Sequence, residues 1–112
     1  MRPTPESVLT QLRKGTLDYC VLAYLQDAPS YGLDIAKQLG RDSALFASEG
    51  TLYPLLARLR KQGWVQTGWR ESTAGPPRRY YSLTGDGRAA LEVFAATWAR
   101  FRDGVDTTLK SH

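Results

Sequence analysis

The most regular apolar pattern in the chain lies between Ser48 and Trp64. Four leucines recur there at positions i, i+3, i+4 and i+7, and one stripe of a helix therefore carries Leu52, Leu55, Leu56 and Leu59. The opposite face is small along its middle and polar or basic at its edges, with Gly50, Pro54, Ala57 and Lys61 flanked by Thr51, Tyr53 and Arg58. Such a face suits a helix that lies in the major groove of DNA. A basic surface helix without a ligand is the alternative that this stretch alone leaves open.

A second apolar stretch comes earlier in the chain. Thr16 to Gln26 is apolar nearly all round, which predicts a buried helix. Pro29 ends it, because proline disfavours helical geometry in the residue before it. The single cysteine, Cys20, lies within this run, and we interpret it as a small core side chain rather than a redox or metal-binding group. Residues 1–7 contain two prolines and predict a loose arm.

Between these two stretches the sequence predicts a shorter helix. Ser30 can cap it, Gly40 suits its C-terminal end, and its apolar face consists of Leu33, Ile35, Ala36 and Leu39. Residues 41–47 form a connection whose first part can continue this helix. Together with the leucine-striped helix, this arrangement predicts a helix-turn-helix.

Pro54 limits where the leucine-striped helix begins. With Thr51 as N-cap, Pro54 falls in the first turn, where its missing N–H costs nothing. With Ser48 as N-cap, the helix starts earlier and bends near Pro54. In both cases the free N–H groups at this helix end suit a phosphate. Glu49 suits the helix dipole and can accept a hydrogen bond from a cytosine amino group.

A β-hairpin is predicted directly after this helix. Trp64 to Trp69 alternates as a strand, residues 70–77 form a polar turn, and residues 78–83 read as the return strand. A hairpin in this place is a wing that lays Arg78 and Arg79 on the DNA backbone or in the minor groove. The alternative is that Arg78 and Arg79 lie in a solvated turn and bind no partner.

The end of the chain predicts a helix of about 20 residues. Thr84 is a good N-cap, whereas Gly85 and Gly87 weaken the first turn. A heptad seam with unusually many aromatic rings then follows, formed by Leu91, Phe94, Trp98, Phe101 and Val105. Part of the seam can rest on its own domain, but we expect it to pack against a second subunit in a twofold dimer. That interface is either closed or holds a small planar aromatic effector between the paired Trp98 rings.

Length and charge narrow the classes of function. The chain has 112 residues and a formal net charge of +4, which suits one domain with an anionic partner. No Ser–His, Cys–His or paired-carboxylate arrangement points to an enzyme. One cysteine and a single histidine, His112, give no metal-ligand spacing, so we expect neither metal nor cofactor. A single free cysteine, no signal peptide and no membrane-length apolar run favour a cytoplasmic protein.

These patterns together give one fold class. It is mainly α with a small β-hairpin, a winged helix-turn-helix plus a C-terminal dimerisation helix. Residues 1–84 form the winged helix domain and residues 85–112 the dimerisation helix, as one compact unit. The expected partner is double-stranded DNA. A winged helix that binds protein or RNA is the alternative, but it requires an apolar outer face on the second helix of the motif.

Several motifs resemble the PadR family of bacterial transcriptional regulators. They are Tyr31-Gly32, the Gly50–Pro54 string GTLYP and the Arg78–Thr84 string RRYYSLT, within a resemblance that runs from Arg13 to Arg88. The resemblance implies a winged helix, a dimer through the first and last helices, and repression that a small phenolic or drug-like ligand releases. A twofold dimer of this kind binds an inverted-repeat operator.

The resemblance also implies roles by position. Tyr31 and Lys37 would touch phosphates, Thr51, Tyr53, Pro54 and Arg58 would enter the groove, Arg78 and Arg79 would serve the wing, and Trp98 would line the dimer interface. The DNA-binding residues expected from all of these arguments together are Tyr31, Lys37, Ser48, Gly50, Thr51, Tyr53, Pro54, Arg58, Lys61, Arg78 and Arg79.

Overall fold

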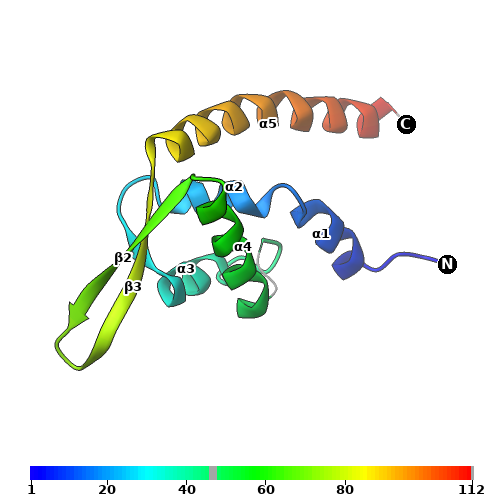
Figure 1. Ribbon diagram of the computed structural model, residues 1–112. Helices are drawn as coiled ribbons and strands as arrows, with labels where there is room; N and C mark the ends of the chain where they lie inside the picture. Colours follow the sequence, from blue (N-terminus) through cyan, green and yellow to red (C-terminus); the bar gives the residue numbers. More distant parts are fainter. Residues whose placement is uncertain (46–47, 112) are drawn as a thin grey trace.

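The computed structural model describes residues 1–45 and 48–111. Helices dominate it, and a three-stranded antiparallel sheet has the order β1-β3-β2 (Figure 1). In chain order the elements are α1 (Pro5–Arg13), α2 (Leu17–Tyr24), β1 (Ser30–Tyr31), α3 (Gly32–Leu39), α4 (Glu49–Lys61), β2 (Val65–Ser72), β3 (Gly75–Leu83) and α5 (Gly85–Ser111). The mainly helical winged fold with a long last helix is therefore confirmed. No helix within the described residues is long and apolar enough to cross a membrane.

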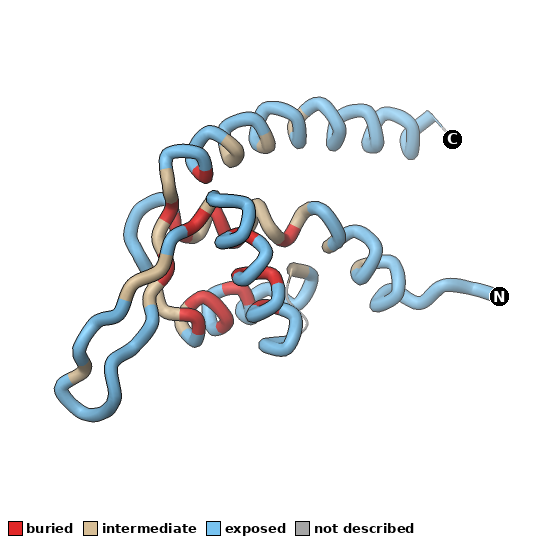
Figure 2. The backbone as a smooth tube through the Cα atoms, in the orientation of Figure 1, coloured by how far each residue is buried: buried red, intermediate tan, exposed pale blue. Residues whose placement is uncertain are grey.

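The core lies between α2, α3, α4 and the base of the sheet (Figure 2). The four leucines of α4 are all buried, with at most 2% of each side chain exposed. Opposite them, α2 contributes Leu17, Val21 and Leu22, and the sheet contributes Val65, Tyr81 and Leu83. The predicted apolar stripe of α4 and the buried helix α2 are both confirmed.

The first helix of the motif differs from its prediction in two ways. Ser30 does not cap α3, because it pairs with Tyr81 in the sheet while Tyr31 takes the N-cap position. This short strand β1 was not predicted, since two residues carry no readable alternation. Leu33 was assigned to the apolar face but is 44% exposed, whereas Ile35, Ala36 and Leu39 are buried.

The N-terminal segment is a helix, so the predicted loose arm is wrong. Thr4 and Ser7 form a reciprocal capping box, and Pro5 occupies the first turn, where proline is tolerated. The last residue of α1, Arg13, donates hydrogen bonds to the carbonyl groups of Ser43 and Ala44, at 2.7 and 2.9 Å. Residues 41–45 form turns rather than an extension of α3, and residues 46–47 of the predicted connection lie outside the described residues.

Ser48 is the N-cap of α4, so the earlier of the two expected starts is the observed one. Pro54 consequently lies inside the helix as its sixth residue. Proline has no N–H, so the carbonyl of Gly50, four residues earlier, loses its usual helical donor. Both residues are exposed, which lets water satisfy that carbonyl.

The hairpin is longer than predicted. Strand β3 begins at Gly75 rather than at Arg78, and the turn shrinks to Thr73 and Ala74. The register pairs Arg70 with Arg78, and an irregularity follows between Arg70 and Ser72. The wing therefore projects well beyond the core (Figure 1).

Thr84 is confirmed as the N-cap of α5. Its hydroxyl accepts from the Gly87 N–H at 3.0 Å and donates to the Gly63 carbonyl at 2.6 Å. Gly87 is buried against the Trp64 carbonyl, so closely that a Cβ atom would collide with it. The lack of a side chain at Gly87 thus allows the start of α5 to pack closely on Trp64, although glycine weakens the first turn of the helix. The helix has 27 residues and extends far past the domain (Figure 1).

Candidate nucleic-acid interface

One side of the molecule carries the exposed face of α4 and the wing, and α5 lies on the other (Figure 1). Because α4 buries its leucines, it exposes the remaining positions, which are Glu49, Gly50, Thr51, Tyr53, Pro54, Ala57, Arg58, Arg60 and Lys61. This face is small along its centre, as the sequence predicted. The N-terminal end of α4 and the tip of the wing project in the same general direction, away from α5 (Figure 1).

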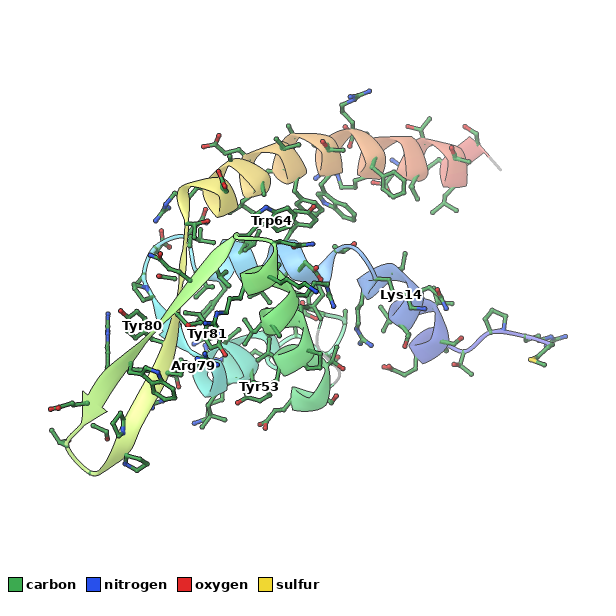
Figure 3. The ribbon with its side chains drawn as sticks, viewed as in Figure 1. Lys14, Tyr53, Trp64, Arg79, Tyr80 and Tyr81 are labelled. Carbon is green, nitrogen blue, oxygen red and sulfur yellow. The ribbon has the colours of Figure 1, made fainter. Side chains whose placement is uncertain are left out.

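The Tyr31-Gly32 and Gly50–Pro54 motifs meet in space. Tyr53 lies against the N-terminal end of α3, and a Cβ atom on Gly32 would come within 3.0 Å of the Tyr53 ring (Figure 3). Gly32 therefore leaves room for this ring. Tyr53 remains 47% exposed, so one edge of it is still available to a partner. The contact joins the starts of the two helices of the motif.

Two hydroxyl groups lie at the start of α4. The side chains of Ser48 and Thr51 are hydrogen-bonded to each other at 3.2 Å. Within the described part of the chain, the Ser48 side chain caps no backbone N–H of α4. The first-turn N–H groups and the positive end of the helix dipole therefore face outward at Gly50, where an anion is favoured.

Arg58 is held by a residue that sequence reasoning did not select. Its Nη2 and Nε atoms donate to the two carboxylate oxygens of Asp18 on α2, at 2.9 and 3.3 Å. This pairing raises the pKa of Arg58 through the hydrogen bond first and the opposite charge second. The guanidinium was expected to enter a groove, but it lies against α2 instead. The two residues are 40 positions apart, so no local pattern signals the pair.

The two adjacent wing arginines point to opposite faces of the hairpin, because successive strand residues alternate. The Arg78 guanidinium lies 3.8 Å from the centre of the Tyr31 ring and 3.9 Å from the Asp34 carboxylate. The Arg79 guanidinium lies 5.6 Å from the centre of the exposed Trp69 ring. Only Arg79 is thus free of a carboxylate among the contacts described, and the structure does not bring the predicted pair together on one surface.

The wing carries a further cation that sequence reasoning placed in the turn. Arg70 lies over the Tyr80 ring at 4.5 Å, on the same face as Arg78. The side chains of Tyr80 and Tyr81 alternate likewise, and Tyr81 points into the core (Figure 3). Arg70 would have been identified from the strand register, because it lies opposite Arg78 in the hairpin. That register requires the longer strands that the structure shows.

The two remaining cationic candidates lie in the last turns of their helices. Lys37 is exposed in the last turn of α3. Lys61 is the last residue of α4, about 18 Å along the axis from Glu49 at 1.5 Å per residue. The structure therefore groups Tyr31, Ser48, Gly50, Thr51, Tyr53 and Pro54 near the two helix starts and separates Lys61 from them.

The seam of α5 is divided between two environments. Phe94 stacks on Tyr19 of α2, with ring centres 4.2 Å apart, and Tyr19 in turn contacts Trp64 at 5.7 Å. Leu91 packs against the core as well. Farther along, Trp98, Phe101 and Val105 are 39%, 63% and 41% exposed. The expectation that part of the seam rests on its own domain holds for the first two residues.

Cys20 is half-buried against the core, and this burial raises the pKa of its thiol. Both observations fit the small core side chain predicted for it. Residues 1–45 and 48–111 contain no group of three or more potential metal ligands. His112, considered as a ligand from the sequence, lies outside the described residues.

Comparison with known proteins gives a consistent result. Residues 21–93 match the sequence model of the transcriptional regulator PadR-like family. The chain is similar to a PadR family regulator of Eggerthella lenta, with 34% identity, a TM-score of 0.83, and coverage of 96% of this chain and 93% of that one. For a PadR-like regulator of Bacillus cereus the identity is 32%, the TM-score 0.80 and the coverage 91% and 99%. An uncharacterized protein of Lysinibacillus sphaericus is 26% identical, over 88% of this chain and 93% of that one.

Proposed function

Because this chain belongs to the PadR-like family of transcriptional regulators, we propose that it binds an inverted-repeat operator as a homodimer and represses transcription there. Membership of the family makes it a transcriptional regulator rather than an enzyme. The proposal adds the mode of DNA contact, the dimer and a small planar aromatic effector.

The main support for the proposed DNA contact is the composition of the exposed face of α4. A helix enters the major groove when small residues permit close approach and polar groups reach the base edges. Gly50, Thr51 and Pro54 supply the close approach, and Tyr53 supplies a half-exposed ring whose hydroxyl lies beside α3. In this face Tyr53 is the one large ring, which fits DNA better than the apolar groove of a protein partner.

The contacts to phosphate come from groups around this face. The first group consists of Ser48 and the first N–H groups of α4. The second consists of Tyr31, the N-cap of α3, and Lys37 in the last turn of α3. Arg79 of the wing is the third. Arg78 contributes less, because Asp34 already offsets its charge. Lys61 is too far along α4 to belong to this set.

The dimer follows from the exposed outer part of the α5 seam. Trp98, Phe101 and Val105 form an apolar stripe on a helix that extends past its own domain. Twofold symmetry would bring the same stripe from a second copy, and burial of large aromatic side chains favours association. Two recognition helices must then lie about 34–36 Å apart to read one turn of DNA. A planar effector between the Trp98 rings would alter that spacing and release the DNA.

The salt dependence of DNA binding tests this function. Duplexes are first selected by the wild-type protein from a random-sequence pool, and their affinity is then measured at several salt concentrations. Arg79→Ala should make the slope of log affinity against log salt shallower by about one unit, because one phosphate contact is lost. Arg78→Ala should change the slope less.

Arg100→Ala on α5 is the control, since it removes the same charge on the side away from the wing. It should leave both affinity and slope unchanged. Failure of the wild-type protein to enrich any duplex would contradict the proposed function. An Arg79→Ala variant with wild-type affinity and slope would contradict the role of the wing.

A further inference from the structure

We propose that Asp18 is a positioning residue for DNA recognition, which holds Arg58 so that α4 presents a fixed face to the bases. The inference rests on the proposed contact between α4 and DNA. It reassigns Arg58 from reading bases to anchoring the recognition helix, and it gives a function to an acidic residue of α2 that no sequence motif selects.

The geometry is that of a two-pronged ion pair. Arg58 donates from Nη2 to Oδ1 of Asp18 at 2.9 Å and from Nε to Oδ2 at 3.3 Å. The Asp18 side chain is 15% exposed and the Arg58 side chain 52% exposed. Asp18 lies in the first turn of α2, where the helix dipole favours a negative charge. The Asp18 carboxylate is therefore the more firmly held partner, and the longer, more exposed Arg58 side chain reaches to it.

The pair holds α4 on one flank, and Tyr53 holds it on the other. Leu52, Leu55, Leu56 and Leu59 fix the buried side of the helix. At 100° per residue, Tyr53 and Arg58 lie on opposite flanks of that stripe. Tyr53 packs against Gly32 of α3, and Arg58 binds Asp18 of α2. Contacts on both flanks therefore add to the buried leucines in restraining rotation of α4 about its axis.

A small rotation would matter for base reading. The side-chain surface of a helix lies about 5–6 Å from its axis, so a turn of about 20° displaces that surface by roughly 2 Å. Hydrogen bonds to base edges tolerate far less than this. Contacts to the phosphate backbone are less demanding, because charge attraction falls off gradually with distance. Loss of the Asp18 anchor should therefore reduce sequence preference more than overall affinity.

The alternative is that Arg58 reads a base. A two-pronged contact with guanine through Nε and Nη2 would use the edge that already faces Asp18, so removal of Asp18 would then free Arg58 and strengthen binding to the selected duplex. A contact through Nη1 and Nη2 would leave Asp18 in place, and removal of Asp18 would then weaken the reading of one base pair. If Asp18 positions α4, its removal weakens binding to the selected duplex and lowers preference at every position that α4 reads. The extent of the lost preference therefore separates the two roles.

The experiment compares Asp18→Asn, Asp18→Ala, Arg58→Ala and the double variant Asp18→Ala with Arg58→Ala. For each, affinity is measured for a duplex selected by the wild-type protein and for a random-sequence duplex of equal length. Each single variant should lower the ratio of the two affinities about three- to tenfold, and the double variant should lower it no further, as expected for residues that act as a unit. The loss should extend to all operator positions read by α4.

Two matched variants complete the test. Asp18→Glu keeps the carboxylate and should retain a ratio within about twofold of the wild type. Asp27→Asn removes an exposed carboxylate beyond the other end of α2 and should leave the ratio unchanged. The thermal unfolding midpoint of every variant is measured, and the isosteric Asp18→Asn decides the result if Asp18→Ala is unstable.

Stronger binding of Asp18→Asn to the selected duplex, or an unchanged affinity ratio, would overturn the inference. Loss of preference at a single operator position in Arg58→Ala would do the same, since it would show that Arg58 reads a base. These outcomes all presuppose that the wild-type protein selects a sequence. If it selects none, the proposed function fails, and that failure is thereby distinguished from a failure of the role of Asp18.

Discussion

Helices α4 and α5 both carry apolar stripes at helical spacing, yet the two stripes have different surroundings. The leucines of α4 are at most 2% exposed, whereas Trp98, Phe101 and Val105 of α5 are 39% to 63% exposed. Residue type does not explain the difference, because the rings of α5 are larger than the leucines. The leucines of α4 share one core cluster with residues of α2, α3 and the sheet, but α5 extends past all of these elements (Figure 1).

The difference shows that spacing predicts a face to be buried but not the surface that buries it. The first turns of α5 follow the rule of α4, since Leu91 and Phe94 pack on α2 and its neighbours. Beyond Phe94 the same periodicity continues without a covering element in the described chain. In the proposed dimer, that covering element is the α5 helix of a second copy.

Truncation of a leucine in α4 should give the largest effect. Leu56→Ala should lower the free energy of unfolding by about 2–5 kcal/mol, because it leaves a cavity in a fully buried site. Leu33→Ala on α3 is the control, since Leu33 is 44% exposed and should cost less than about 1 kcal/mol. Denaturant titrations of both variants measure this. Equal losses would show that the stripe of α4 is not the core.

The second-largest loss of stability should come from substitution of Gly87, where the start of α5 packs against Trp64. Gly87→Ala should cost about 1–3 kcal/mol of stability, because the added methyl group collides with the Trp64 carbonyl and must displace the start of α5. Gly85→Ala, two residues earlier, meets no described atom within 4 Å and should be neutral or stabilising. Thermal unfolding distinguishes the two. If both variants melt alike, α5 is not anchored where the structure places it.

The outer part of the α5 seam should affect association rather than folding. Phe101→Asp places a charge in the proposed interface and should raise the dimer dissociation constant at least about tenfold, without a comparable loss of protomer stability. Sedimentation over a range of concentrations measures this. Val93→Ala serves as control, because Val93 is 68% exposed and lies off the seam. A Phe101→Asp protein that stays dimeric like the control would refute the role of this stripe.

The smallest effect concerns the effector. A planar aromatic compound that binds between the Trp98 rings should quench part of the protein fluorescence, and Trp98→Ala should abolish that part while DNA affinity changes less than about threefold. Trp69→Ala on the wing is the control, since it removes another exposed indole far from α5. Absence of quenching across a broad panel of planar compounds would contradict the effector site. It would support the closed interface, which is the other arrangement that the sequence allowed.

Local sequence was sufficient for several features of the fold. The leucine stripe of α4, the buried run of α2 and the Thr84 cap all depend on residues within a few positions of one another. The capping box at Thr4 and Ser7 was equally local, but two prolines in residues 1–7 suggested a loose arm. One proline in fact occupies the first turn of α1, where its missing N–H costs nothing.

The sequence by itself determined the apolar faces of α2 and α4, the start of α5 at Thr84 and the residues that make up the small centre of α4. Tertiary structure decided the partner of each side chain. It placed Arg78 beside Tyr31 and Asp34, paired Ser30 with Tyr81, and joined Arg58 to Asp18 across 40 residues. The physical reason is range, since periodicity and capping depend on backbone geometry over one or two turns. Ion pairs, sheet pairing and helix packing instead depend on distances that exist only once the chain has folded.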